Sequence, residues 1–179
     1  DYIVDLAREL KARHGEDLLS RSEEEAVAAC ARYAADQIID SIRRDLLDFG
    51  ISFDQWFSEQ SLYDTGRVEA CIAALRDREL VYAEDGALWF QTSAFGDEKD
   101  RVVVRANGIT TYFASDIAYH YDKRERGYDH LIDVLGADHH GYVTRVRGGL
   151  EAMGYAREDL EVQFIQFVTL YRSGERVQM

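Results

Sequence analysis

Three polar residues follow an apolar run that is typical of a buried strand. The run covers residues 131–135, and Gly136-Ala137-Asp138-His139-His140 comes directly after it. Ligands of open parallel sheets bind beyond the carboxyl ends of the strands, so this turn is a candidate ligand site. Gly136 would let a ligand approach the backbone, Asp138 could accept hydrogen bonds from a ribose, and His139 could stack on a base. The alternative interpretation is structural, with Asp138 only capping the next helix.

A second candidate site lies upstream, at Tyr112 and Asp116. The two residues are four positions apart in a stretch with helical periodicity, so they share one face of the predicted helix. A phenol beside a carboxylate can receive a cationic group with several donors, and a guanidinium fits best because it pairs with a carboxylate in a fork. The alternative is an ordinary solvated pair on a helix surface.

The triplet Asp138-His139-His140 also admits a different chemistry. It is similar to the signature of a family of manganese-dependent phosphoesterases, whose two metal ions need many oxygen ligands. Asp116 and Asp133 are the obvious further carboxylates in this sequence. That chemistry leaves the pairing of Asp116 with Tyr112 unexplained.

The elements around these residues alternate between helix and strand. A helix over about 111–124 precedes the strand at 131–135, and a helix over about 139–153 and a strand over 161–168 follow it. Continuous apolar strands joined by a helix indicate a parallel sheet covered on both faces. The predicted fold class is therefore α/β, with residues 106–179 as the second half of a Rossmann-like nucleotide-binding fold.

Residues 1–105 have another pattern, which we interpret as an α+β insertion before that half fold. One helix is expected over 2–14, and a second begins at a capping box formed by Ser22 and Glu25 and ends at Gly50. The second helix carries an apolar stripe, which predicts a buried face: Val27, Ala31, Ala34, Ile38, Ile42, Leu46 and Phe49.

The rest of the insertion is predicted to combine one helix with short strands. The helix begins at Asp64 or Thr65, and Glu84-Asp85-Gly86 is typical of a hairpin turn. The strands are expected at 51–57, 80–83, 87–90 and 101–105.

Composition limits the classes of protein that remain. The chain has 179 residues, a formal net charge of −13, 46% hydrophobic residues and no proline, which is a globular composition. Its acidity makes it a poor nucleic-acid binder by itself. No apolar run is long enough to span a bilayer. Cys30 and Cys71 are expected as reduced, buried thiols, which fits a cytoplasmic protein. Because Asp1 opens the chain, we expect a piece of a longer one.

Four stretches in order resemble the bacterial arginyl-tRNA synthetase family, which belongs to the class I aminoacyl-tRNA synthetases. They are Phe57-Ser58-Glu59-Gln60-Ser61-Leu62-Tyr63, Gly96-Asp97-Glu98-Lys99-Asp100-Arg101-Val102, Thr111-Tyr112-Phe113-Ala114-Ser115-Asp116-Ile117-Ala118-Tyr119-His120 and Gly136-Ala137-Asp138-His139-His140-Gly141-Tyr142. The resemblance implies ATP-dependent activation of L-arginine to arginyl-adenylate and its transfer to tRNA(Arg). It also implies Mg²⁺ arriving with ATP, and no metal bound by the protein itself.

The resemblance assigns expected roles to the candidate residues. Tyr112 and Asp116 match positions that bind the arginine side chain, with Asp116 pairing the guanidinium. The expected ATP-binding residues are Gly136, Asp138, His139, Phe167 and Val168, the last two through backbone groups.

The sequence departs from the family pattern in its phosphate-binding elements. The His-x-Gly-His element is absent, and Gln178 stands where the first lysine of the second family loop is expected, just before Met179. Catalytic residues therefore stay unassigned, and the isolated chain is expected to be inactive in tRNA charging. A non-catalytic synthetase-like binding module is the other alternative.

Overall fold

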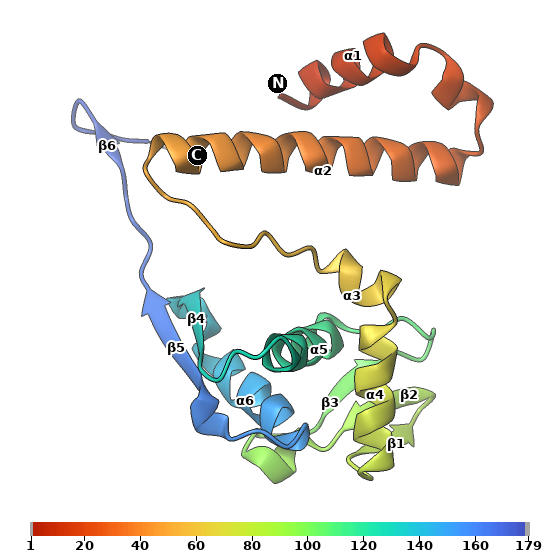
Figure 1. Ribbon diagram of the computed structural model, residues 1–179, viewed down its shortest axis with the longest axis vertical. Helices are drawn as coiled ribbons and strands as arrows, with labels where there is room; N and C mark the ends of the chain where they lie inside the picture. Colours follow the sequence, from red (N-terminus) through yellow and green to blue (C-terminus); the bar gives the residue numbers. More distant parts are fainter. Residues whose placement is uncertain (1, 178–179) are drawn as a thin grey trace. The chain divides into compact units, whose positions relative to one another are not determined.

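The computed structural model describes residues 2–177, in an order that begins with two helices and ends with a short hairpin (Figure 1). The chain forms two compact units, Asp1–Trp56 and Phe57–Met179. The boundary predicted near residue 105 lies inside the second unit. The assignment of 1–105 and 106–179 as separate segments stays a prediction about domain organisation.

The first unit is a pair of helices. Helix α1 covers Tyr2–His14, a 3-10 turn η1 covers Asp17–Ser20, and the long helix α2 covers Glu23–Asp48. The capping box is confirmed, because Ser22 and Glu25 exchange hydrogen bonds between their side chains and backbone N–H groups. These local bonds fix the point at which α2 begins.

The apolar stripe of α2 does not form a buried face within this unit, which corrects the prediction. No residue of α2 is buried, and Leu10 of α1 is the buried hydrophobic residue of the described part of the unit. Cys30 is exposed, against the expectation of a core thiol, whereas Cys71 is buried. A stripe shows that a helix can be covered, but the covering element has to be present to bury it.

Residues 51–57 do not form the predicted strand. They follow α2 without regular structure, although Phe53 packs edge-on against Trp56 with ring centroids 5.4 Å apart. Aromatic residues favour strands only where a neighbouring strand can pair with them, and none of the described strands pairs with this segment.

The second unit begins with helices α3 (Gln60–Asp64) and α4 (Arg67–Asp77) and a three-stranded antiparallel sheet. The strands are β1 (Val81–Glu84), β2 (Ala87–Phe90) and β3 (Arg101–Val104), and β2 lies between the other two. The predicted hairpin is confirmed: Asp85 and Gly86 both have positive φ, as a two-residue hairpin turn requires.

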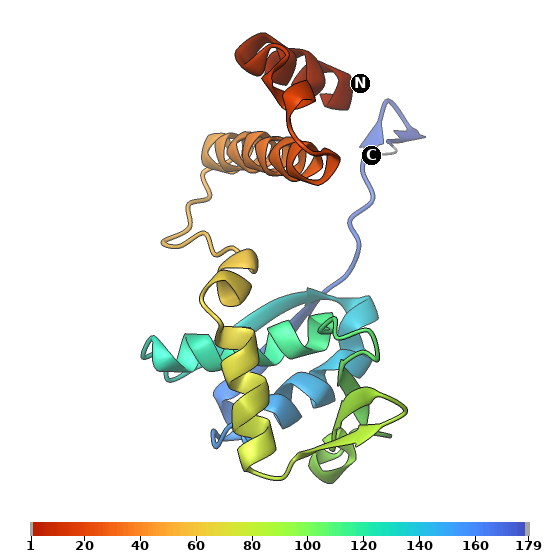
Figure 2. The ribbon, with the colours of Figure 1, turned by 90° about the vertical axis from the view of Figure 1, so that its right-hand side faces the viewer.

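Helix α5 (Tyr112–Glu125) leads into the parallel part of the unit. Strand β4 (Leu131–Gly136) pairs in parallel with β5 (Leu160–Ile165), and helix α6 (Val143–Ala152) connects them (Figure 2). This strand–helix–strand unit confirms the predicted α/β class. The connection starts with a 3-10 turn, η3 (Ala137–Tyr142), so α6 begins four residues later than the predicted 139.

The buried core lies in the second unit. One cluster joins α3, α4, the antiparallel sheet, α5 and the end of α6, and a smaller one joins α6 to β4 and β5. The larger members are Leu62, Leu75, Phe90, Phe113 and Ile117 in the first cluster and Leu131, Leu150 and Leu160 in the second.

The parallel strands are covered on one face by the described residues, whereas the sequence predicted cover on both. Leu131 and Leu160 are buried on the covered face, and Ile132, Val134 and Ile165 are exposed on the other. Side chains alternate between the faces of a strand, so the two sets are separated by their position alone.

The predicted strand 161–168 ends at Ile165. Residues 166–170 lead into a small hairpin of β6 (Tyr171–Arg172) and β7 (Glu175–Arg176), with Ser173 and Gly174 at positive φ in its turn. Gln178 and Met179, on which the expected start of the phosphate loop falls, lie outside the described residues. Among the described helices, none is both long and apolar enough to cross a membrane.

Candidate functional site

The candidate site is built on the first turns of α5. Thr111 precedes the helix and ties it to the end of β3, since its N–H donates to the oxygen of Val103 at 3.0 Å and its hydroxyl to the oxygen of Val102 at 2.9 Å. Tyr112 and Asp116 therefore project from the first two turns of a helix whose start is fixed by the sheet. Tyr112 is exposed and Asp116 is half-buried.

A second tyrosine, Tyr142, is the hydrogen-bond partner of the Asp116 carboxylate. The Tyr142 hydroxyl, at the end of η3, donates a hydrogen bond to Asp116 Oδ2. The Tyr142 ring lies 5.9 Å from the Tyr112 ring and 6.1 Å from the Phe113 ring, measured between centroids. The tyrosine that bonds Asp116 thus lies close to two aromatic rings of α5. Sequence reasoning assigned no role to Tyr142, although it stands in the quoted stretch 136–142.

Asp116 differs in its partners from three other carboxylates of the unit whose side chains expose little surface. Asp97, Asp122 and Asp133 each form ion pairs with two basic side chains: Arg101 and Arg145, Arg67 and Arg126, and His120 and Lys123, respectively. Among the ion pairs within residues 2–177, none includes Asp116. Its carboxylate is bonded to a neutral hydroxyl instead.

The electrostatics of Asp116 follow from this arrangement. Burial raises the pKa of Asp116 above its usual value, and the nearby carboxylates of Glu59 and Asp133 raise it further. The hydrogen bond from Tyr142 and the charge of His120 act in the opposite direction. The net shift is upward, so the ionised form of this carboxylate lacks the stabilisation that a cation would supply.

Glu59 is a further acidic side chain of the site, and sequence reasoning did not single it out. The Ser115 hydroxyl lies within hydrogen-bond distance of two acceptors, Glu59 Oε1 and the backbone oxygen of Tyr112, the latter at 2.8 Å. Glu59 precedes α3, 57 residues before Asp116 in the chain. Its place in the stretch 57–63 was the available signal, but only the packing of α3 on α5 brings it to Asp116.

A hydrogen-bonded pair, His120 of α5 and Asp133 of β4, lies next to Asp116. Nδ1 of His120 lies 2.7 Å from the backbone oxygen of Asp116, and Nε2 lies 2.7 Å from Asp133 Oδ2. The His120 ring on α5 is therefore held between its own helix and β4. Lys123 Nζ adds a contact of 3.0 Å to Asp133 Oδ1. Burial by itself raises the pKa of Asp133. Its hydrogen bonds and ion pairs with His120 and Lys123 outweigh this effect and lower the pKa to about 2.

The residues predicted to bind the nucleotide, Gly136, Asp138 and His139, lie at and just after the carboxyl end of β4. Asp138 folds its carboxylate back over Gly136: a Cβ at position 136 would lie 2.5 Å from Asp138 Oδ1. The glycine therefore provides space for a side chain here. Both the Asp138 and the His139 side chains are more than half exposed, and His139 faces the Tyr142 ring at 6.5 Å. His140 instead stacks on Phe164 of β5, at 3.6 Å between ring centroids.

The structure thus brings the two candidate groups together through Tyr142, which contacts both Asp116 and His139. Phe167 and Val168 lie apart from this cluster along the chain, in the segment after β5. Phe167 is 90% exposed and Val168 is 76% exposed. The ring contacts and hydrogen bonds of the described residues do not join either of them to the site.

The metal-dependent alternative finds no support in this geometry. Within residues 2–177, no three His, Cys, Asp or Glu side chains lie so that they could hold one metal ion. Asp133, one of the expected extra ligands, is bonded to His120 and Lys123. Asp116, the other one, is bonded to Tyr142.

Comparisons with known proteins agree on one family. The family model "tRNA synthetases class I (R), catalytic domain" matches residues 8–178. The chain is 58% identical over 179 residues to an arginine–tRNA ligase of Desulfosudis oleivorans and 52% identical over 178 residues to one of Syntrophotalea carbinolica. These alignments include 100% and 99% of this chain and 32% of each relative, so the chain spans about a third of the length of the curated relatives it matches.

Solved structures give the same result. A structure assigned to an arginyl-tRNA synthetase of Campylobacter jejuni matches with a TM-score of 0.88 at 38% identity, and the match includes 100% of this chain and 39% of that one. An arginyl-tRNA synthetase of Thermus thermophilus matches with a TM-score of 0.67, over 87% of this chain and 35% of that one. The second match is 19% identical, so it supports the fold alone.

Proposed function

Because the chain belongs to the class I arginyl-tRNA synthetase family, we propose that it forms the arginine-binding and nucleotide-binding part of a longer arginine–tRNA ligase. The longer protein would activate L-arginine with ATP and transfer it to tRNA(Arg). The isolated chain, which spans about a third of the length of its relatives, would not catalyse tRNA charging alone.

The observation that carries the proposal is the half-buried carboxylate of Asp116, which accepts a hydrogen bond from a tyrosine hydroxyl and takes part in none of the ion pairs of residues 2–177. A guanidinium would supply the missing charge and several N–H donors in a plane. We propose that Asp116 pairs with the arginine guanidinium, that Tyr112 lies against it, and that the Tyr142 hydroxyl holds the carboxylate in place. Glu59 adds a second negative charge on the same side.

The carboxyl end of β4 suits the nucleotide. We propose that Asp138 accepts hydrogen bonds from the ribose hydroxyls of ATP and that His139 contacts the base, with Gly136 leaving room for the Asp138 carboxylate. Backbone groups of Phe167 and Val168 would meet the adenine. Mg²⁺ would arrive with ATP and bridge its phosphates, as Mg²⁺ commonly does in sites that bind nucleotides.

In this reaction the carboxylate oxygen of arginine forms a bond to the α-phosphorus of ATP while the bond to pyrophosphate breaks. The contribution of this chain is to hold the two substrates in line, since the guanidinium and the nucleoside are bound on either side of Tyr142. The groups that stabilise the charge of the phosphates are not assigned to residues of this chain. The tRNA would be bound by other parts of the longer protein, because this chain is acidic. We propose the cytoplasm as its compartment.

The proposal is tested on this chain by amide-resolved NMR with separate additions of L-arginine, ATP and Mn²⁺, and with L-lysine as the control. We expect arginine-selective shifts at Tyr112 and Asp116 and ATP shifts at Gly136–His139. In the longer protein, pyrophosphate exchange with ATP should require L-arginine.

Two results would overturn the proposal. Tight Mn²⁺ broadening at Asp138 and His139, with no response to arginine, would favour the phosphoesterase chemistry. Arginine binding by the longer protein without arginine-dependent exchange would favour a non-catalytic binding module.

A further inference from the structure

We propose that Asp97 is a positioning residue for the arginine site, because its carboxylate holds Arg145 beside the ring of Tyr142, the tyrosine that donates a hydrogen bond to Asp116. This inference rests on the proposed function for its effect on arginine. Asp97 lies in the loop between η2 (Thr92–Phe95) and β3, and it touches neither Asp116 nor the expected nucleotide residues.

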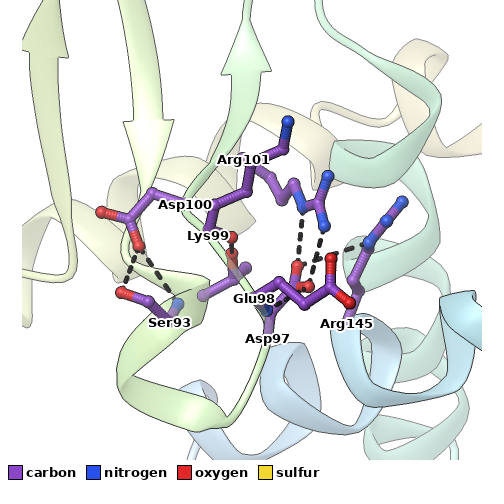
Figure 3. Close-up of polar contacts among 8 residues, drawn as sticks. Ser93, Asp97, Glu98, Lys99, Asp100, Arg101 and Arg145 are labelled. Atoms are coloured by element: carbon purple, nitrogen blue, oxygen red, sulfur yellow. Dashed lines mark hydrogen bonds and ion pairs between the residues drawn. The ribbon is translucent and has the colours of Figure 1, made fainter.

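Asp97 is almost fully enclosed by donors (Figure 3). Arg101 donates to both carboxylate oxygens, with Nε at 2.7 Å from Oδ2 and Nη2 at 2.8 Å from Oδ1. The N–H of Glu98 adds a bond of 2.8 Å, and Nε of Arg145 lies 3.3 Å from Oδ2. The side chain of Asp97 is 5% exposed. The hydrogen bonds from Arg101 lower the pKa of Asp97, so it stays ionised as a fixed anchor.

Arg145 connects this anchor to Tyr142. It lies on the first turn of α6, three residues after Tyr142, and its guanidinium carbon is 5.8 Å from the centroid of the Tyr142 ring. The same ring carries the hydroxyl that donates to Asp116. A guanidinium held by Asp97 therefore limits the positions that the Tyr142 ring can adopt.

Arg101 fixes the anchor itself. The pKa of Arg101 is raised chiefly by its hydrogen bonds with Asp97, so the pair stays ionised. The two bonds from Arg101 orient the Asp97 carboxylate, and the same Oδ2 oxygen faces Arg145.

The backbone holds the Asp97 loop against α6. A Cβ at Gly148 would lie 2.9 Å from Cβ of Phe95, so glycine is needed for η2 to pack this closely on the helix. The Thr92 hydroxyl donates to the oxygen of Lys99 at 2.8 Å and closes the loop from within. The packing of η2 on α6 therefore sets the position of the Asp97 loop relative to this helix. The ion pair of Asp97 with Arg145 then fixes the Arg145 side chain.

Asp100 offers a matched control in the same loop. Its carboxylate accepts hydrogen bonds from the backbone and hydroxyl of Ser93, at 3.1 and 2.6 Å, and from the Tyr82 hydroxyl at 3.0 Å. Its pKa is also lowered, first by the Ser93 hydroxyl. These contacts tie the loop to η2 and β1, and none of them reaches α6.

The test compares Asp97→Asn with Asp100→Asn in two measurements. In this chain with ¹³C-labelled tyrosine, Asp97→Asn should shift the ring signals of Tyr142, assigned with Tyr142→Phe, and Asp100→Asn should leave them in place. In the longer protein, Asp97→Asn should raise KM for arginine about tenfold and change KM for ATP less than about twofold. Arg145→Met should have the same effect, and the double variant should add little to it, because the residues act through one contact.

The two measurements separate this inference from the proposed function. If the unchanged protein shows no arginine-dependent exchange, the proposed function fails, and the Tyr142 signals still test the positioning. If Asp97→Asn and Asp100→Asn act alike on both the ring signals and KM, the positioning role is wrong. If Asp97→Asn does not fold, Arg145→Met, which keeps the apolar stem, decides between these outcomes.

Discussion

The carboxylates of the second unit show how neighbours decide what a residue does. Asp133 faces His120 and Lys123, and its pKa falls to about 2. Asp116 is one helical turn from His120, yet its pKa is raised, because burial outweighs the hydrogen bond from Tyr142. The first is a structural ion pair, and the second is a carboxylate that a cationic ligand would stabilise.

Replacing Asp116 with Asn should separate the two substrates. The variant keeps a similar shape but loses the charge, so KM for arginine should rise by about two orders of magnitude or more, while KM for ATP changes much less. Steady-state pyrophosphate exchange in the longer protein measures both constants. Equal increases in the two KM values would contradict the assignment of Asp116.

Arginine binding should also depend on pH. The guanidinium stays charged, so binding needs the ionised form of Asp116, whose pKa is raised by burial, Glu59 and Asp133 and lowered by Tyr142 and His120. Affinity should fall as the pH drops through that raised pKa, which lies above the ordinary aspartate value of 3.8. Calorimetric titration with arginine between about pH 4 and pH 7 measures the slope. A profile that persists in Asp116→Asn would assign the dependence to another group.

Asp133 should stabilise the fold in a pH-dependent way. Its folded pKa of about 2 lies below its ordinary value of 3.8, so its contribution is present above the higher value and is lost as the pH falls toward 2. At neutral pH, Asp133→Asn should lower the free energy of unfolding by roughly 1–2 kcal/mol after allowance for solvent screening. Urea unfolding at pH 7 and pH 3 tests this. Asp64→Asn, which changes an exposed helix-surface carboxylate, is the control.

At the scale of elements, two adjacent glycines let α6 pack closely against η2 and α5. A Cβ at Gly148 would meet Phe95 of η2, and a Cβ at Gly149 would lie 2.8 Å from Cγ1 of Ile117 on α5. These close approaches, in the second half of α6, set how near the helix lies to η2 and α5. Tyr142 directly precedes α6, so its position relative to Asp116 depends on this packing. The geometry of the site is therefore a consequence of helix packing.

Gly149→Ala should destabilise the second unit. Ile117 is buried and β-branched, so it cannot turn away from the added methyl group, and α5 and α6 must separate. The overpacking outweighs the gain in helix propensity, and we expect a loss of about 1–2 kcal/mol by chemical denaturation. Gly141→Ala is the matched control, since nothing lies within 4 Å of its added Cβ. Equal stabilities of the two variants would show that the close approach costs nothing.

At the scale of the whole molecule, the two units differ in how much they bury. Both core clusters consist of residues of the second unit, whereas the first unit buries Leu10 among its described hydrophobic residues. The residues of the candidate site, from Glu59 to Val168, also belong to the second unit. Folding and ligand binding should therefore depend on residues 57–179.

Removal of residues 1–56 should leave a cooperatively folding protein. The truncated chain keeps both core clusters, so thermal unfolding followed by circular dichroism should remain a single sharp transition within a few degrees of the original. A peptide of residues 1–56 should unfold gradually, because helices with so little buried surface are marginal. Loss of cooperative unfolding in the truncated chain would show that the first unit contributes to the core.

Local features were predictable from the sequence. The capping box at Ser22 and Glu25 and the turn at Asp85-Gly86 depend on residues that are neighbours in the chain, and both are present. The parallel pair of β4 and β5 was predictable from two apolar runs joined by a helix. The place of Tyr112 and Asp116 on the first two turns of one helix follows from a spacing of four.

Burial, by contrast, depended on partners that the sequence pattern does not identify. The stripe of α2 and the thiol of Cys30 have the composition of a core, yet neither is buried, and none of the described strands pairs with the aromatic segment 51–57. Both faces of β4 carry apolar side chains, so the sequence pattern does not distinguish them. Leu131 packs against α6 and is buried, whereas Ile132 and Val134 on the other face are exposed.

The sequence by itself determined the family resemblance, the α/β class and the helix that carries Tyr112 and Asp116, because each depends on short-range patterns. Only the tertiary structure decided that Asp116 is bonded to Tyr142, that Glu59 lies beside it and that Asp97 holds Arg145. These contacts join residues 26, 57 and 48 positions apart in the chain. Their partners are selected by the packing of α3, α5, α6 and the Asp97 loop, which no local periodicity records.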